Sequence, residues 1–278
     1  MSPPALSEVA HPARPLAAGR AIGEGVGQVA TIVGYEARKL RHDPTELLLR
    51  AIQPALWLVV FGSVFSSVHV IPTAPLTYLQ FLTPGILAQS VLFIAIFYGI
   101  ASIRERELGI IIKFLVSPAR RMILVGGRAL SASLRGLSQA VVVLLLATAL
   151  SVHLDLTPLR VLGVVVSVVL GSALFSTLSM VIASVVRTQE RFLGIGQLLT
   201  MPLFFASNAI YPLSIMPSWL RPFALANPLT YLVDALRTLV TPGAATLLFP
   251  LWVDLSVLFG VTLGLVALCA ALYPRMAQ

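Results

Sequence analysis

The residues best suited to chemistry form a charged island in an apolar chain. Residues 104–107 read Arg-Glu-Arg-Glu, and residues 117–121 read Ser-Pro-Ala-Arg-Arg. Upstream, no Lys, Arg, Asp or Glu occurs between residues 51 and 103. Alternating charge signs favour a solvated or docked surface over one buried in lipid. Two interpretations follow: a docking face for a soluble partner, or stop-transfer charges beside an apolar run, 110–116, that lies in the headgroup layer.

Catalytic and metal-binding patterns are missing from the sequence. His11, His42, His69 and His153 are scattered, with no pair at metal-ligand spacing. Neither lysine lies in a phosphate-binding G-x-x-x-x-G-K-[ST] loop. We therefore expect no catalytic residue, no metal and no cofactor on this chain, and a membrane-embedded enzyme or scaffold has little support. If nucleotide powers its activity, the hydrolase is another polypeptide.

The composition is that of a membrane protein. Hydrophobic residues make up 58% of the chain and charged residues 11%, whereas soluble domains carry roughly a quarter charged residues. Mean hydropathy is +0.94. The net charge of +8 does not indicate nucleic acid, because the basic residues lie between apolar spans and are not gathered on one soluble face. The expected partner is the lipid bilayer.

The apolar pattern predicts an all-α polytopic membrane protein with six transmembrane helices. A helix needs about 20 mostly apolar residues to cross the hydrocarbon core. The predicted spans are about 47–68, 79–103, 130–152, 159–186, 192–211 and 250–273. Lys and Arg concentrate before the first span and in the second-to-third loop, so both termini are expected in the cytoplasm. Residues 1–28 are expected to form a flexible cytoplasmic tail ahead of a transmembrane domain at 29–278.

Two further helices are predicted outside the spans. Residues 26–41 have apolar positions at helical spacing and charges on other faces, which indicates an interfacial amphipathic helix on the inner surface. Asn227 can cap a second helix with Pro228 in its first turn. This helix is too short to span, so it either dips in from outside as a re-entrant segment or lies on the outer surface. We expect Asp234 and Arg237 to pair on its wet side. The alternative is a partly exposed amphipathic helix without a specific role.

The island and several other segments resemble the ABC type-2 exporter permeases. Residues 105–109, Glu-Arg-Glu-Leu-Gly, are similar to the family's E-R-E-x-G box, and residues 115–121 to its L-L-x-[ST]-P-x-x-R box. The segments Arg41-His42-Asp43-Pro44, Phe81-Leu82-Thr83-Pro84-Gly85 and Asn227-Pro228-Leu229-Thr230-Tyr231 agree in order and position. The amino-acid sequence of these segments is most similar to the daunorubicin-resistance-like drug-export branch, and the nodulation-factor and polysaccharide exporters share much of the same pattern.

This resemblance implies that the island is the coupling helix on which a separate ATPase subunit sits. The implied ATPase-coupling residues are Arg104, Glu105, Arg106, Glu107, Gly109, Leu115, Ser117, Pro118 and Arg121. It also implies a multi-pass protein of the bacterial inner membrane, a second permease copy as partner, and ATP and Mg on the ATPase. The external helix implied before the last span includes Asn227, Pro228, Asp234 and Arg237.

The expected substrate path runs along spans two and five, which the resemblance places at the centre. Its candidate residues are Gln89, Ser90, Phe93, Phe97, Gln197, Thr200 and Phe204. Such residues also serve to pack helices or face lipid. No charge lies along this path, so the expected cargo is hydrophobic or amphipathic, a drug-like compound or a lipid, with a lipid-linked glycan or polysaccharide as the alternative. A secondary carrier is the rival class. A secondary carrier usually needs ionisable residues in the bilayer core, and this chain offers almost none. We expect water to reach Asp254, which lies near the outer end of span six, so it does not count as a core residue.

Overall fold

The computed structural model describes residues 52–68, 71–108, 121–186, 188–241 and 248–272. The predicted tail at 1–28, the amphipathic helix at 26–41 and the start of the first span lie outside these ranges. So do Gly109, Leu115, Ser117 and Pro118 of the predicted coupling segment.

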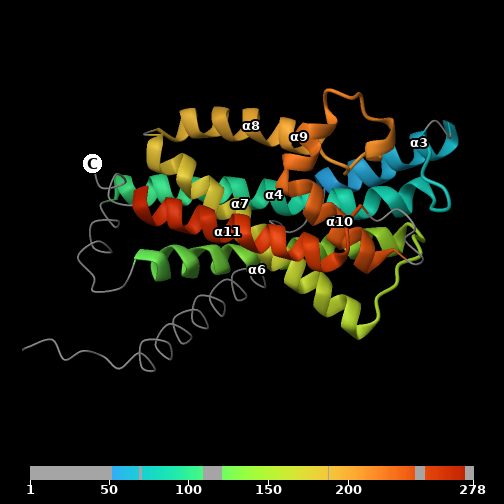
Figure 1. The fold of residues 1–278 in the computed structure, drawn as a ribbon, viewed down its shortest axis with the longest axis horizontal. Coiled ribbons are helices and arrows are strands. Elements are labelled where there is room, and N and C mark those ends of the chain that lie inside the picture. The colour runs from blue at the N-terminus through green and yellow to red at the C-terminus, as the bar shows by residue number, and fades with distance from the viewer. Residues whose placement is uncertain (1–51, 69–70, 109–120, 187, 242–247, 273–278) are drawn as a thin grey trace, which may run out of the picture.

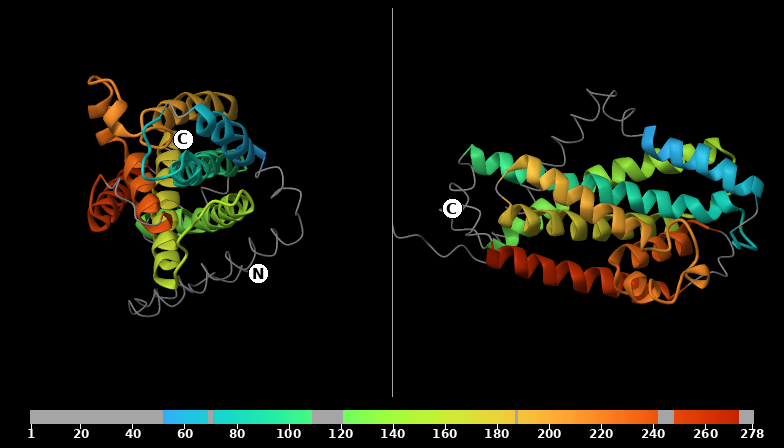
Figure 2. Two further views of the ribbon diagram at one scale, coloured as in Figure 1. Left: turned by 90° about the vertical axis from the view of Figure 1, so that its right-hand side faces the viewer. Right: turned by 90° about the horizontal axis from the view of Figure 1, so that it is seen from above.

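The described chain is an elongated bundle of helices that run roughly along one axis (Figure 1, Figure 2). Four helices are long and apolar enough to cross a membrane: α4 (Tyr78–Glu107), α6 (Arg121–Ala149), α7 (Pro158–Val185) and α11 (Leu251–Leu272). A shorter apolar helical segment, Ile52–Ser66, contains the π turn η1 (Trp57–Phe61) and most of α3 (Gly62–Val68). The predicted all-α polytopic architecture is confirmed.

Helix α4 begins and ends where its sequence provides signals. Thr77 and Gln80 form a capping box, in which each side chain bonds the other residue's backbone N–H. The 30 residues that follow extend about 45 Å. The helix passes through Arg104 to Glu107 before it ends, four residues beyond the predicted span 79–103. We call the end of the bundle that contains Glu107 the charged end, and the end that contains Tyr78 the opposite end.

Helix α7 lies at the centre of the bundle and packs against α4, α6 and α11. Small residues permit this close packing. A Cβ on Gly136 of α6 would lie 2.1 Å from the Ser172 hydroxyl, and one on Gly99 of α4 would lie 2.2 Å from the Ser179 hydroxyl. Ser179 also accepts from the backbone N–H of Gly99 at 2.9 Å and donates to the carbonyl of Ile96. Side-chain hydroxyls therefore join α7 to α4 in the middle of the apolar bundle.

Helix α8 (Gln189–Phe205) ends earlier than predicted. The sequence suggested a fifth span that continued to residue 211, but residues 206–211 leave the helix and pass close to α4. A Cβ on Gly85 would lie 2.2 Å from the carbonyl oxygen of Ala209. The Asn227 side-chain amide donates to the carbonyls of Leu203 at 2.6 Å and Ala206 at 2.8 Å. These bonds satisfy carbonyls that the end of α8 leaves without helical partners.

The same asparagine begins the external helix. Its side-chain oxygen accepts from the N–H of Leu229 at 2.9 Å, and Pro228 occupies the first turn of α10 (Pro228–Val240). The predicted cap and helix are confirmed. Ten of the 13 residues of α10 are buried, and the helix packs against α4, α7 and α11. It is therefore packed into the bundle after the short helix α9 (Arg221–Ala226), and the choice between a re-entrant position and the outer membrane surface stays a prediction.

The polar residues of α10 and α11 correct a second expectation. Asp234 and Arg237 are 0% and 1% exposed, so the predicted location on a wet side is wrong. Asp234 accepts from the N–H groups of Leu248 and Phe249, both at 3.0 Å. Arg237 donates to the carbonyl of Asn208 at 2.9 Å and stacks 3.9 Å from the Phe81 ring centroid. These contacts are possible because α10 turns its polar side toward the loops that enclose it.

Asp254 also departs from expectation. It lies in the first turn of α11 and is 0% exposed, whereas the sequence placed it within reach of water. Helix α10 packs against α11. Neither carboxyl oxygen has a hydrogen-bond partner within the described residues.

Candidate functional site

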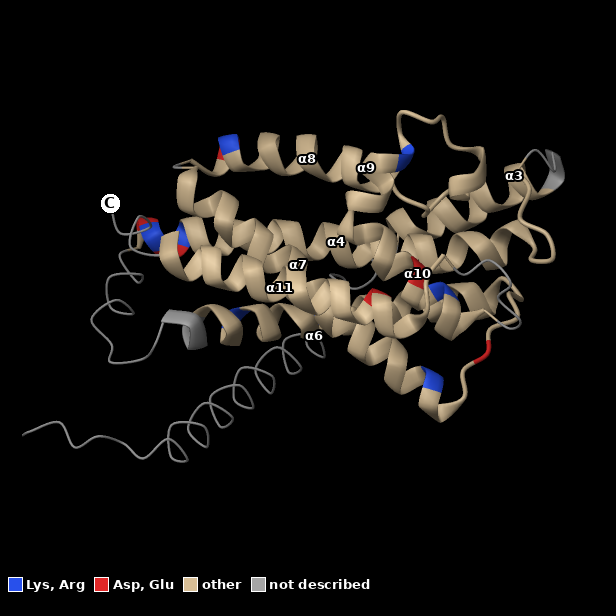
Figure 3. Cartoon of the chain, in the orientation of Figure 1, with Lys and Arg blue, Asp and Glu red and all other residues tan. Residues whose placement is uncertain are grey.

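Charged residues gather toward the two ends of the bundle, with long uncharged stretches between them (Figure 3). At the charged end, the first tie comes from Glu105. Its carboxylate lies 2.6 Å from the guanidinium of Arg128 on α6. The two side chains are 33% and 16% exposed, so solvent weakens the attraction and the pair contributes about 0.2–1 kcal/mol. Its main effect is to fix α4 against the first turns of α6.

Arg106 makes the second tie, to the end of α7. Its guanidinium donates to the carbonyl of Val186 at 3.0 Å and to that of Ala183 at 2.5 Å. Ala183 lies in the last turn of α7, where carbonyls have no intrahelical partner, and Val186 is the residue that caps the helix. An arginine is well suited here because it presents several donors in a planar fork and carries the charge that a helix C-terminus favours.

Glu107 makes the third tie, to α8. Its carboxylate accepts from the side-chain amide of Gln189 at 3.0 Å. Gln189 is the first residue of α8, directly after the cap Thr188, whose hydroxyl accepts from the N–H of Arg191 at 3.4 Å. Three consecutive residues of α4 thus bond three different helices, and any displacement of this end of α4 also acts on α6, α7 and α8.

The remaining predicted coupling residues are less connected or lie outside the described ranges. Arg104 is exposed, and Leu108, which follows the helix, is 66% exposed. Arg121 begins α6. The charged end therefore has a half-buried side, where Glu105 and Arg106 make their ties, and a solvent side that includes Arg104, Glu107 and Leu108.

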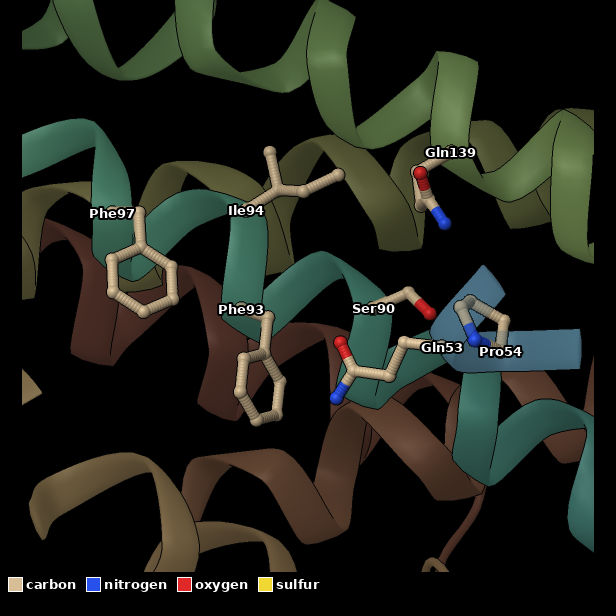
Figure 4. A pocket seen from close by; sticks show the side chains of 7 residues that line it. All are labelled: Gln53, Pro54, Ser90, Phe93, Ile94, Phe97 and Gln139. Atoms are coloured by element: carbon tan, nitrogen blue, oxygen red, sulfur yellow. The ribbon is translucent and has the colours of Figure 1, made fainter. Parts of the chain in front are cut away.

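A pocket of about 260 Å³ lies between Ile52–Ser66, α4 and α6. Three predicted path residues line it together: Ser90, Phe93 and Phe97 (Figure 4). The other lining residues are Gln53, Pro54, Ile94 and Gln139. Carbon-rich walls with a few amides and a hydroxyl are typical of sites for small amphipathic molecules.

The other predicted path residues lie elsewhere. Gln89 is 3% exposed and does not line this pocket. Thr200 bonds its own helix at the carbonyl of Gly196, and Phe204 packs edge-on to Trp57. Gln197 is exposed. Helix α8 does pack against α4, but the pocket forms on the side of α4 that faces α6 and the first span.

Sequence reasoning missed Gln53, Gln139 and an arginine within a span. Arg135 belongs to α6, and its guanidinium carbon lies 5.7 Å from the ring centroid of Tyr98 on α4. A charged residue in the middle of an apolar stretch was the available signal, because such residues are costly in a bilayer and frequently functional.

At the opposite end, a tyrosine reinforces the end of α8. The Tyr211 hydroxyl donates to the carbonyl of Phe205. Burial raises the pKa of this phenol, so it stays protonated and remains a donor at neutral pH. Within the described ranges, no group of three or more His, Cys, Asp or Glu could hold a metal ion.

Comparison with known sequences identifies the family. Residues 27–241 match the family model of the ABC-2 type transporter, which covers more than half of the chain. This chain belongs to the ABC-2 type transporter family. The matched region contains α4, its three ties and α10.

Several named permeases are similar to this ABC-2 chain. The transport permease ycf38 of Cyanophora paradoxa is 30% identical over 207 residues, which cover 72% of this chain and 70% of the relative. The daunorubicin resistance ABC transporter permease protein DrrB1 of Streptomyces coeruleorubidus is 25% identical, covering 85% and 81%. The inner membrane transport permease YadH of Escherichia coli K12 is 25% identical, covering 67% and 72%. This ABC-2 chain is a membrane-spanning transport permease.

Proposed function

We propose that this permease is the membrane subunit of an ATP-driven exporter in the bacterial inner membrane. Two permease copies and two ATPase subunits would form the transporter, with ATP and Mg bound by the ATPases. The charged end and both termini would face the cytoplasm. The cargo would be a hydrophobic or amphipathic molecule such as a drug-like compound or a lipid.

One observation carries this proposal: three consecutive residues at the end of α4 tie that helix to α6, α7 and α8. A transporter driven by a separate motor needs a rigid element that passes movement from the docking site to the transport path. Helix α4 extends from these ties to the pocket residues Phe97 and Ser90. A push on its charged end would therefore alter both the packing of the bundle and the shape of the pocket.

The solvent side of the charged end supports ATPase docking. Leu108 is 66% exposed directly after the charged turns of α4, and Arg104 is exposed beside it. A leucine at this position gains free energy when a partner covers it, about 1.5–3 kcal/mol for complete burial. Leu108, which would contact the ATPase, and Arg106, which ties α4 to the end of α7, thus allow docking and tying to be tested separately.

Co-purification tests docking. The partner to use is a P-loop ATPase without spans, encoded in a neighbouring reading frame. The permease variant Leu108→Asp should retain less than about a tenth of wild-type ATPase binding, because it places a carboxylate in an apolar contact. Leu156→Asp is the matched control, since Leu156 is 40% exposed at the opposite end. Equal ATPase binding by wild type and Leu108→Asp would refute the docking assignment.

Arg106 tests the tying contribution separately. Arg106→Met keeps much of the side chain's apolar length but removes both bonds to the end of α7. We expect ATPase binding to persist while transport per ATP hydrolysed falls severalfold. If binding and transport both remain at the wild-type level, the tie has no part in coupling.

A further inference from the structure

We propose that the buried side chains of Asp234 on α10 and Asp254 on α11 hold one monovalent metal cation, such as sodium, at the opposite end of the bundle. The cation joins the start of α11 to α10. This inference goes beyond the proposed function, because it gives the cation a structural role in the permease itself and does not make it the cargo.

The two carboxylates lie where α10 packs against α11. Asp234 accepts from the backbone N–H groups of Leu248 and Phe249, both at 3.0 Å, and these residues shortly precede α11. Asp254 follows in the first turn of α11, close enough to Asp234 for their charges to repel. Figure 3 shows acidic and basic positions gathered beside α10. The packing of the two helices therefore brings two acidic side chains together inside the bundle.

Several buried oxygens at this junction have no hydrogen-bond partner. Both carboxyl oxygens of Asp254, Oδ1 of Asp234 and the hydroxyl of Thr230 make no hydrogen bond within the described residues. All three side chains are 0% exposed. Thr230 precedes Asp234 by four residues and so shares its face of α10, one turn away. Because buried polar atoms are normally paired, these oxygens form a candidate ligand set.

The charges of the neighbouring residues determine the charge of the ion. Arg237 is the only basic residue of α10, and its guanidinium donates to the carbonyls of Asn208 and Phe81. Residues 238–253 contain no Lys, Arg, His, Asp or Glu. The only charged residue of α7 is Arg160, which pairs with Asp155 at 3.1 Å. Two ionised carboxylates and one guanidinium therefore leave a net charge of −1, which one monovalent cation balances.

A metal cation suits these oxygens better than a proton does. A proton on Asp254 would leave its O–H without an acceptor, because neither carboxyl oxygen has a hydrogen-bond partner within the described residues. The first turn of a helix also favours an ionised carboxylate. A hard cation, in contrast, binds several oxygens at once, and non-helical backbone next to helix ends supplies carbonyls to sodium in membrane transporters. Such a site needs only two acidic ligands, so it differs from the groups of three or more that the described ranges lack.

Thermal unfolding of the purified permease in phosphatidylcholine nanodiscs tests the proposal. The midpoint, followed by tryptophan fluorescence, is measured at one pH in sodium chloride and in choline chloride of equal ionic strength. Wild type should unfold about 2–5 °C higher in sodium chloride, because an ion that binds only the native state stabilises it. The gain should saturate as the sodium concentration rises, as expected for one site.

Asp254→Asn gives the sharpest comparison, because it keeps the shape of the side chain and removes its charge. Its midpoint should be the same in both salts. In choline chloride it should equal or exceed the wild-type midpoint, since wild type then buries an uncompensated charge. Asp155→Asn is the matched control: Asp155 is an acid at the same end that is 30% exposed and pairs with Arg160. This variant should keep the full dependence on sodium.

Two results would overturn the inference. In one, the wild-type midpoint is the same in both salts, which is the result expected if Asp254 is protonated and binds no metal. In the other, wild type and Asp254→Asn gain equally in sodium chloride, which indicates a general salt effect. Binding of radioactive sodium to the wild-type permease gives a measure that does not depend on any variant. We expect unlabelled sodium to displace it and choline to leave it bound, and absence of displaceable binding would also refute the site.

Discussion

Replacing Gly85 by alanine should destabilise the permease, because α4 approaches the backbone that follows α8 at this residue. An ideal Cβ on Gly85 would lie 2.2 Å from the Ala209 carbonyl oxygen and 2.8 Å from its carbonyl carbon. Carbon and oxygen atoms normally stay more than about 3 Å apart, so one of the two backbones must move by about 1 Å. Overpacking of this kind costs about 1–3 kcal/mol.

The single cysteine provides the assay. Cys269 is the chain's only cysteine and is 0% exposed in α11, so a fluorogenic maleimide labels it only when the bundle opens. Heating the purified protein with this reagent gives an unfolding midpoint. The Gly85→Ala midpoint should fall by about 5–10 °C, taking a few degrees per kcal/mol for a chain of this size.

Two further variants make the test specific. Gly264→Ala is the matched control, because a Cβ there meets no atom within 4 Å, and alanine favours the helix by up to about 1 kcal/mol. Its midpoint should equal or exceed that of wild type. Adding Ala209→Gly to Gly85→Ala should not restore stability, since the close atoms belong to the Ala209 backbone. A Gly85→Ala midpoint at or above the wild-type value would refute the reasoning.

Two other predictions concern side chains that join helices. Asn227→Asp keeps an oxygen for the N–H of Leu229 but loses the amide that donates to two carbonyls at the end of α8. It should therefore lower the free energy of unfolding as much as Asn227→Ala does, by about 1–3 kcal/mol, and lower the thermal midpoint with it. A wild-type midpoint would show that Asn227 only caps α10. For the Glu105–Arg128 pair, a double-mutant cycle with glutamine at each position should give a coupling of about 0.2–1 kcal/mol. A coupling of zero at low salt would contradict the tie.

The sequence predicted the main helices because their signals are local. Charge-free stretches located α4, α7 and α11, and Asn227-Pro228 located α10. The length of α8 was overestimated because residues 206–211 contain no charge, proline or glycine to mark its end. Their departure from the helix involves Asn227, which lies 21 residues after Ala206.

The orientation of polar residues was harder to predict. The spacing of Asp234 and Arg237 showed that they share a helix side but not which neighbours cover it, and α10 proved to be buried. The ties of Glu105, Arg106 and Glu107 join residues that are up to 82 positions apart, which local spacing does not reveal. Arg135 was visible in the sequence, but its contact with Tyr98 on α4 was not.

ATP-driven transport is the central claim, and reconstitution measures it most directly. The experiment uses proteoliposomes that contain the permease and its ATPase, with the charged end facing the external solution. ATP and the hydrophobic fluorescent dye N-phenyl-1-naphthylamine, which serves as the cargo, are added outside. We predict uptake that requires ATP, stops with an ATPase unable to hydrolyse it, and falls with Leu108→Asp. Uptake by the permease alone, driven by a proton or sodium gradient and indifferent to ATP, would contradict the account and indicate a secondary carrier.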